Sequence, residues 1–269
     1  MNEKETREFE KIMDVTHGRI DRQQVFNDFN ELFAIHISNA VDPVHLHTRL
    51  ARAKDIEKQY TEREIDEMLQ YRQMFATMYA KSHKMGKYQN LMAHLSETNG
   101  LTRKGQDQTP VCLAELTAAL TLLDMDESKI RQHIDETGFI TVADDSAGTG
   151  GMLIAAAEQI DKMKINYFRH MVARAIEIDS RMVHQCYIQL SMYAIPAVVI
   201  HGNTLTLDER DRWYTPAYIW GNWIWKSPMP ISAGRNANDE LLKMATDPMY
   251  AAMRKMDALF HNTPQKKPK

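Results

Sequence analysis

The sequence predicts an α/β fold in which a Rossmann-like, doubly wound sheet follows a helical N-terminal region. Short apolar runs typical of buried parallel strands occur at residues 139–143, 167–178 and 196–200. Residues 152–160 and 180–193 follow the first two runs and have the composition or spacing of helices. Strands that alternate with helices along a chain predict a parallel sheet with helical crossovers.

A helical region is expected before the sheet, over residues 1–104. Apolar side chains recur there at helical spacing, and Asp42-Pro43 ends the first of these stretches. Residues 1–20 are polar and are expected to be partly disordered, whereas residues 81–104 are expected to form a loop with a short helix. The three main helices are expected at residues 25–37, 43–60 and 62–80.

Composition and charge place limits on function. The 269 residues suit one or two domains, and a net charge of −3 supplies no overall positive field for nucleic acid. Cys112 and Cys186 are the only cysteines, and they lack the spacing of a metal site. So few cysteines fit a protein of the reducing cytosol. His45 and His47 would point apart on a helix, so they do not suggest a metal site either. We therefore expect a cytoplasmic protein without a metal, a signal peptide or a membrane span.

A glycine-rich turn follows the first predicted strand and organises the rest of the chain. Asp144 ends that strand, and the turn runs from there to Gly151. A phosphate-binding loop needs Lys and then Ser or Thr after its last glycine, but Met152 and Leu153 stand there. The acid would repel phosphate and could instead accept hydrogen bonds from a cationic ligand such as S-adenosylmethionine, which carries an ammonium group and a sulfonium centre.

This turn resembles the first motif of the N6-adenine DNA methyltransferases, in particular the modification subunits of type I restriction systems. That family carries Asp-Pro-x-Cys-Gly-Thr-Gly-Gly before an apolar helix. Asp145 and Ala147 stand here in place of its Pro and Cys. The alternative is a generic glycine turn after a strand. The residues that match the family motif are Asp144, Gly148, Thr149, Gly150 and Gly151.

Two further segments carry the resemblance. The segment 105–110 resembles the family's Gly-Gln-x-x-Thr-Pro, which covers the methionine end of the cofactor. Glu177 stands where the family has an acid that holds the ribose hydroxyls. The alternative for the second segment is an ordinary strand-to-helix turn in which Asp179 or Ser180 caps the helix.

A third similarity lies at the end of the third strand, where the family has Gly-Asp-x-Leu. This chain has Asn203 in place of the Asp. The amide oxygen of Asn203 could accept a hydrogen bond from the adenine amino group of the cofactor. The resemblance implies that Gly148 and Gly150 make room for the cofactor. It implies a S-adenosylmethionine site formed by Gln108, Thr109, Pro110, Asp144, Ala147, Gly148, Thr149, Gly150, Glu177 and Asn203.

The family's catalytic fourth motif (Asn, Asp or Ser, then Pro-Pro, then Tyr or Phe) is not found, so the catalytic residues remain unassigned. One near match is Ser227-Pro228, followed by Met and Pro. The other is the stretch from Asp247-Pro248 to Tyr250, which also fits the start of a helix. In active relatives such a motif would bind the target amino group and stack on the flipped base.

The aromatic segment 213–225 is unusual, with four tryptophans in thirteen residues. We interpret it as a core strand at the edge of the sheet, in preference to a surface that stacks on bases or docks a partner. The chain then divides into a helical region at 1–104, a cofactor-binding core at 105–230, and a C-terminal helix with a basic tail at 231–269.

The resemblance implies methyl transfer from S-adenosylmethionine to adenine N6 in DNA, linked to restriction-modification or to protection of phage or plasmid DNA. DNA and either a second protein subunit or another copy of the chain are the expected partners. The alternative is an inactive, cofactor-binding relative that acts as an interaction or anti-restriction protein. A small-molecule methyltransferase would explain the acidic charge but not the match at residues 105–110.

Overall fold

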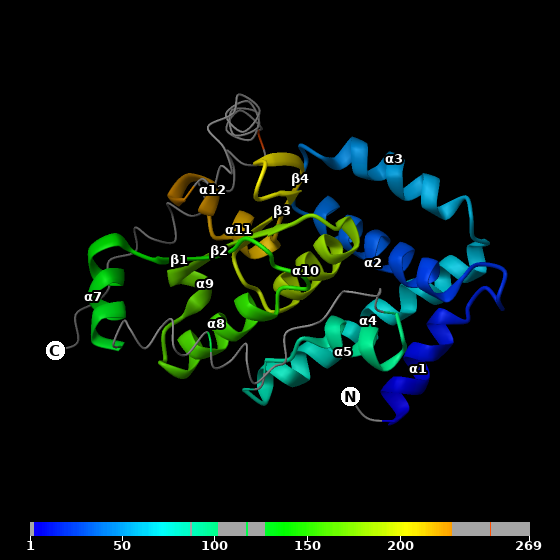
Figure 1. Ribbon diagram of the computed structural model, residues 1–269, viewed down its shortest axis with the longest axis horizontal. Helices are drawn as coiled ribbons and strands as arrows, with labels where there is room; N and C mark the ends of the chain where they lie inside the picture. Colours follow the sequence, from blue (N-terminus) through cyan, green and yellow to red (C-terminus); the bar gives the residue numbers. More distant parts are fainter. Residues whose placement is uncertain (1–2, 87, 102–116, 118–126, 228–247, 249–269) are drawn as a thin grey trace.

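The computed structural model describes residues 3–86, 88–101, 117, 127–227 and 248 (Figure 1). Its centre is a four-stranded sheet with the order β1-β2-β3-β4. Three strands are parallel and the last is antiparallel to its neighbour. The mixed α/β architecture expected from the sequence is therefore present. The strands are β1 (Ile140–Asp144), β2 (Met171–Glu177), β3 (Ala197–Asn203) and β4 (Asp208–Tyr214).

Helical crossovers connect the parallel strands, as the alternating pattern predicts. α8 (Gly151–Lys162) follows β1, and α10 (Ser180–Met192) joins β2 to β3. The short helix α9 (Tyr167–His170) replaces the first part of the predicted second strand, which begins only at Met171. Because the strands are parallel and pair Asp144 with Ala175, their carboxyl ends lie at one edge of the sheet.

The two faces of the sheet are covered differently. Small side chains on one face, such as Ala173, Ala175 and Ala197, belong to the core that also contains residues of α8 and α10. β-branched side chains such as Val172 and Val198 point to the other face. There they pack with α11 (Pro216–Trp220) and α12 (Trp223–Lys226). The alternation follows from the period of two in a strand.

The N-terminal region is helical, and the three predicted main helices are confirmed. The expectation of partial disorder over residues 1–20 is wrong for the described residues, because a helix forms there and buries Phe9, Ile12 and Met13. The helices of this part are α1 (Glu3–Met13), α2 (Arg22–Asn39), α3 (Leu46–Glu57), α4 (Glu62–Lys84) and α5 (Leu91–Thr98), and α7 (Glu127–Thr137) precedes the sheet.

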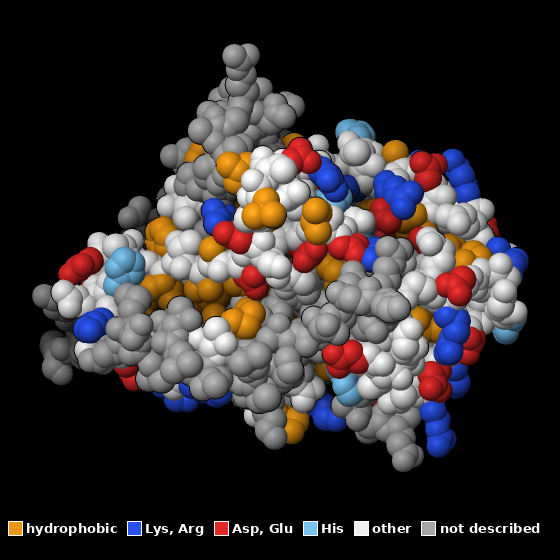
Figure 2. All heavy atoms as spheres, viewed as in Figure 1, with side chains coloured by type: hydrophobic (Ala, Val, Ile, Leu, Met, Phe, Trp, Pro, Cys, Tyr) orange, Lys and Arg blue, Asp and Glu red, His pale blue; other side chains and the backbone are white. Residues whose placement is uncertain are grey.

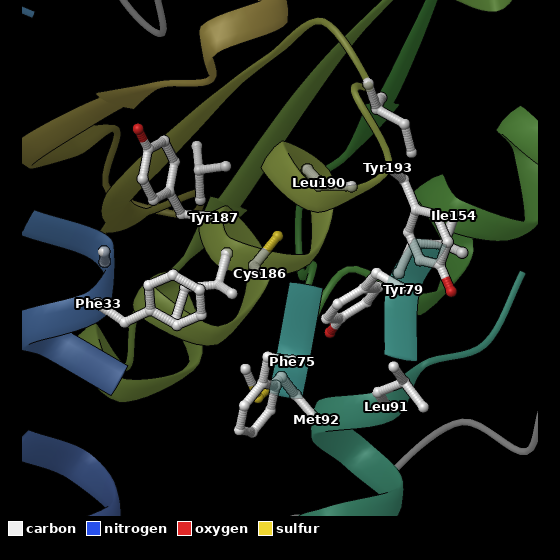
Figure 3. Close-up of a cluster of buried hydrophobic side chains, with 14 of the residues drawn as sticks. Phe33, Phe75, Tyr79, Leu91, Met92, Ile154, Cys186, Tyr187, Leu190 and Tyr193 are labelled. Carbon is white, nitrogen blue, oxygen red and sulfur yellow. The ribbon is translucent and has the colours of Figure 1, made fainter. Parts of the chain in front are cut away.

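The helical region packs directly on α10 and so shares a core with the sheet (Figure 3). The ring of Tyr79 on α4 meets Tyr193 edge-on, with 5.0 Å between centroids. Its hydroxyl donates to Gln189 Oε1 at 3.0 Å. Both tyrosines are almost fully buried, so the contact fixes α4 against α10.

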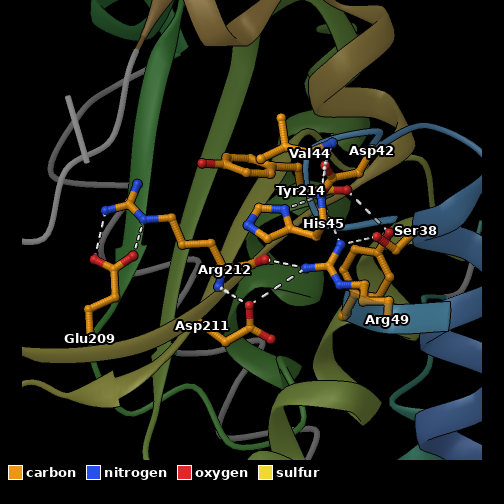
Figure 4. A network of polar contacts seen from close by, with 10 residues as sticks. Ser38, Asp42, Val44, His45, Arg49, Glu209, Asp211, Arg212 and Tyr214 are labelled. Atoms are coloured by element: carbon orange, nitrogen blue, oxygen red, sulfur yellow. Dashed lines mark hydrogen bonds and ion pairs between the residues drawn. The ribbon is translucent and has the colours of Figure 1, made fainter. Parts of the chain in front are cut away.

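A second contact joins α3 to the edge strand β4 through a buried guanidinium (Figure 4). Arg49 contacts Asp42 at 2.8 Å and also bonds Ser38 and the carbonyl oxygen of Arg212. Its guanidinium carbon lies 4.0 Å from the ring centroid of Trp213. We call these residues the Arg49 joint.

The aromatic segment is largely core, as predicted. Trp213 and Tyr214 are buried at the end of the edge strand. The rest of the segment forms α11 and α12, which the sequence interpretation did not anticipate, and Trp220 is 61% exposed. None of the helices in the described part of the chain is long and apolar enough to cross a bilayer.

Candidate functional site

Three of the predicted site residues end neighbouring strands and lie at the same edge of the sheet. Asp144 ends β1, Glu177 ends β2 and Asn203 ends β3. Burial and, to a smaller extent, the negative charge of Glu177 on the neighbouring strand raise the pKa of Asp144. In open parallel sheets, ligands bind outside this carboxyl edge.

The glycine turn after β1 has one open side and one packed side. Gly148 and Gly150 have φ of +54° and +88°, in the left-handed region that favours glycine. A Cβ at Gly148 would meet no atom within 4 Å, whereas a Cβ at Gly150 would lie 2.9 Å from Cys186 Sγ. A Cβ at Gly151 would lie 2.7 Å from Asn90 Nδ2.

This geometry corrects one expectation about the turn. Gly148 faces open space, but Gly150 makes room for the thiol of Cys186 rather than for a ligand. The side chains of Ala147 and Thr149 are also buried, with exposures of 6% and 1%. Of the predicted cofactor contacts at 147–150, only Gly148 is not buried, and an added Cβ there would meet no neighbour.

Glu177 connects the second strand to the glycine turn. Its Oε2 accepts a hydrogen bond from the Gly148 N–H at 2.9 Å, and its Oε1 accepts from the Asp179 N–H at 2.9 Å. Asp179 in turn caps α10 by accepting from the Arg181 N–H at 3.0 Å. The alternative of Asp179 as helix cap is thus confirmed. It is compatible with a ligand at Glu177, because a carboxylate offers about four acceptor positions.

Asp144 is an acid held in an unfavourable environment. Burial raises its pKa above the ordinary value, and the charges of Asp145 and Glu177 add to this rise. A hydrogen bond from the Ser146 N–H at 3.1 Å offsets part of the rise. The nearby cation Arg174 pairs with Asp145 at 3.0 Å instead. Within the described residues, Asp144 has no cationic partner, so a bound cation would relieve its environment.

The β3–β4 turn reaches across the carboxyl edge. Thr204 Oγ1 donates to the carbonyl oxygen of Asp145 at 2.6 Å. The Asn203 Oδ1 accepts from the N–H groups of Leu205 and Thr206 at 2.9 and 3.4 Å, so this oxygen already shapes the turn. The Nδ2 of Asn203 makes no hydrogen bond with another described residue.

Exposed apolar side chains line the same edge. Ile178 is 54% exposed, Leu205 94% and Leu207 53%. Figure 2 shows acidic and hydrophobic side chains mixed over the part of the molecule where Figure 1 places β3 and β4. The edge therefore combines carboxylates with apolar surface, which suits a ligand with both cationic and flat apolar parts.

The N-terminus of α8 adds polar main chain to the site. Gly150 precedes the helix, and no side chain caps it. The first N–H groups of a helix have no partner within the helix. They could hydrogen-bond a carboxylate of a ligand placed above Gly148.

The first catalytic candidate is not brought to this edge. Ser227 follows α12 directly, and its carbonyl oxygen accepts from the Tyr218 hydroxyl at 3.0 Å. α12 lies beside the amino end of β1, since Trp223 meets Phe139 edge-on with centroids 5.2 Å apart. Asp144 lies at the opposite end of that strand.

The remaining predicted site residues cannot be placed at the edge. Pro248 is exposed and helical. Pro228, Asp247 and Tyr250 lie outside the described residues, as do the predicted cofactor contacts Gln108, Thr109 and Pro110.

Three residues behind the turn were not predicted. Asn90, Cys186 and Gln189 contact the turn from the side opposite the open edge. A local signal existed only for Asn90, which stands before a short apolar stretch as helix caps do. Nothing local indicates that these side chains meet the turn.

The described residues contain no group of three His, Cys, Asp or Glu arranged to hold a metal. His45, considered from the sequence as a metal ligand, contacts Asp42 through Nδ1 at 2.7 Å. No protein-family model, curated protein or solved structure matches the chain. The resemblance to methyltransferases therefore remains a prediction that rests on the motifs.

Proposed function

We propose that the chain binds S-adenosylmethionine at the carboxyl edge of β1, β2 and β3, in the manner of a Rossmann-like methyltransferase. The observation that carries this proposal is the hydrogen bond from the Gly148 N–H to Glu177. It joins a glycine turn after one strand to an acid at the end of the next. Nucleotide-binding α/β folds use this combination to hold a ribose beside a close backbone approach.

The residues at the edge fit the chemical parts of the cofactor. Glu177 retains acceptor capacity for the ribose hydroxyls after its two main-chain bonds. Asp144 lacks a cation in the described residues and would hold the ammonium group. Ile178 and Leu205 offer apolar surface to the adenine ring.

When bound, the cofactor supplies an electrophilic methyl group. The proposed acceptor is the N6 amino group of adenine in DNA, in a restriction-modification or DNA-protection setting. Direct transfer needs no covalent intermediate on the protein, so the chain has to orient the donor, exclude water and accept charge. Asp144 and Glu177 are proposed to orient the donor. The group that binds the target amine is not assigned.

A second candidate function is a cofactor-binding protein without transferase activity, which acts through a partner protein. The placement of Ser227 at the amino end of β1 favours it, because it keeps the polar residue of one candidate catalytic motif away from the carboxyl edge. The proposed partners are DNA for the first candidate and a protein subunit for the second.

Calorimetry with S-adenosylmethionine, combined with transfer of labelled methyl groups to unmethylated DNA, tests both candidates on one preparation. Binding with transfer to adenine supports the enzyme, and binding without transfer supports the second candidate. Glu177→Gln should weaken binding at least about tenfold, the effect of one lost hydrogen bond to a charged group. Asp135→Asn on the exposed face of α7 is the matched control. Absence of binding by the unaltered chain would refute both.

A further inference from the structure

Asn90 contacts the glycine turn on the side opposite the open edge, and both polar atoms of its side chain form hydrogen bonds. Its Nδ2 donates to Thr149 Oγ1 at 2.8 Å, and Thr149 Oγ1 in turn lies 3.0 Å from Asn90 Oδ1. The same Oδ1 accepts from Gln189 Nε2 at 2.9 Å and from the Ala93 N–H at 3.1 Å. One amide thus bonds the turn, α10 and the start of its own helix.

The turn is shaped to admit this side chain. A Cβ at Gly151 would lie 2.7 Å from Asn90 Nδ2, which is closer than real Cβ atoms approach. Gly151 has no positive φ, so its backbone does not itself require glycine. Its lack of a side chain is explained by the space that Asn90 occupies.

Asn90 is partly exposed, but both of its side-chain partners are buried. Thr149 is 1% exposed and Gln189 is fully buried. Gln189 Nε2 also donates to the Thr149 carbonyl oxygen at 2.6 Å, and Gln189 Oε1 accepts from the Tyr79 hydroxyl and the Met92 N–H. Hydrogen bonds shielded from water hold geometry better than exposed ones, because no solvent competes for the partners.

We propose that Asn90 is a positioning residue for the cofactor site, through which the helical region fixes the glycine turn. It holds Thr149 from behind, so that Gly148 keeps its N–H on Glu177 and the start of α8 stays aimed at the carboxyl edge. This inference rests on the proposed function. It adds to that function the prediction that a residue without ligand contact sets the affinity for S-adenosylmethionine.

Two substitutions in the 269-residue chain separate this role from simple helix capping. Asn90→Ser retains a capping oxygen for α5 but is too short to reach Thr149. Thr149→Val keeps the shape of the residue and removes its hydroxyl. Asn99→Ala, at the other end of α5, is the control, because among the described residues its amide bonds only Leu95 and Thr98 of the same helix.

At a temperature where all variants are folded, we expect Asn90→Ser and Thr149→Val each to raise the Kd for S-adenosylmethionine about tenfold. The double variant should be no worse than about twentyfold, because both changes remove one interaction. Asn99→Ala should bind like the unaltered chain. Affinities of Asn90→Ser and Thr149→Val within twofold of the unaltered chain would overturn the inference while leaving the proposed function intact.

Hydrogen exchange in the ligand-free protein tests the positioning separately. The Gly148 amide should exchange at least about fivefold faster in Asn90→Ser than in Asn99→Ala, because its bond to Glu177 is no longer held from behind. Equal exchange would overturn the inference even if the unaltered chain binds no S-adenosylmethionine. Failure to bind together with faster exchange would reject the proposed function and retain the mechanical role of Asn90.

Discussion

The Arg49 joint and the carboxyl edge both hold a carboxylate largely out of water, but only the carboxylate at the joint has cationic partners among the described residues. At the joint, Asp42 is fully buried and contacts both His45 and Arg49 (Figure 4). Burial alone would raise the pKa of Asp42, but the hydrogen bond and charge of His45 and the charge of Arg49 together lower it. The pKa of Asp144 at the edge is instead raised.

The difference separates two uses of a buried carboxylate. A carboxylate with cationic partners helps to fix a side chain, here that of Arg49, which in turn joins α3 to β4. A carboxylate that is desolvated without a cation costs stability, and such groups concentrate at functional sites. The contrast supports the proposal that Asp144, rather than Asp42, binds a cationic ligand.

The largest expected effect comes from breaking the joint. Arg49→Met should lower the free energy of unfolding by about 3–5 kcal/mol, since among the described residues it leaves the buried Asp42 with His45 as its one remaining side-chain partner. Urea unfolding measures this value. Arg63→Met on α4 removes an exposed pair and should cost at most about 0.5 kcal/mol. Similar costs for the two variants would contradict the distinction between the joint and ordinary surface pairs.

The packed side of the glycine turn should give the next largest effect. Gly150→Ala should cost about 2–3 kcal/mol in unfolding free energy, from its φ of +88° and the 2.9 Å approach to Cys186 Sγ. Gly148→Ala, which meets no neighbour, should cost only about 1 kcal/mol. If the added side chain clashes as described, Cys186→Ala should recover part of the Gly150→Ala loss but none of the Gly148→Ala loss.

At the edge, removing the charge should stabilise the protein slightly. Because folding raises the pKa of Asp144, its ionised form disfavours the folded state above that pKa. Asp144→Asn should therefore raise the Tm at pH 7, and the gain should vanish as the pH falls below the ordinary Asp value. The same variant should weaken S-adenosylmethionine binding. A lower Tm at pH 7 would show that the carboxylate is structural, like Asp42.

The smallest expected effect concerns the buried thiol of Cys186, which should not react with a labelling reagent in the folded protein. Burial raises the pKa of the Cys186 thiol, and the charges of Asp144 and Glu177 add to this rise. In a Cys112→Ser background, Cys186 should not react with an aromatic disulfide reagent until the protein unfolds. Rapid labelling of the folded protein would mean that the packed side of the turn opens readily.

Much of the fold between residues 139 and 203 could be predicted, because each element there carries a strong local pattern. The apolar runs, the glycine turn and the helix after it need no distant information to be recognised. The helix over Glu3–Met13 was missed because only Phe9, Ile12 and Met13 mark its buried face among charged residues. Its stability comes from tertiary packing, which local composition does not report.

The candidate site was predictable only on its open side. Asp144, Gly148 and Glu177 belong to motifs with a fixed order and spacing. The contact of Asn90 with Thr149 joins residues 59 positions apart and has no periodic signature. The direction in which Gly150 faces was also beyond the sequence, because it depends on where α10 places Cys186.

The shared core has a consequence for how the chain unfolds. One continuous apolar cluster extends from Phe9 in α1 to Trp213 in β4, so the helical region and the sheet should melt in a single cooperative transition. A fragment beginning at residue 105 would lose the partners of α10 and expose its apolar face. A ligand bound at the carboxyl edge would, by linkage, reduce the population of unfolded molecules in which the amides of α4 exchange with solvent. The helices that precede the sheet in the sequence thereby become part of any energetic response to its ligand.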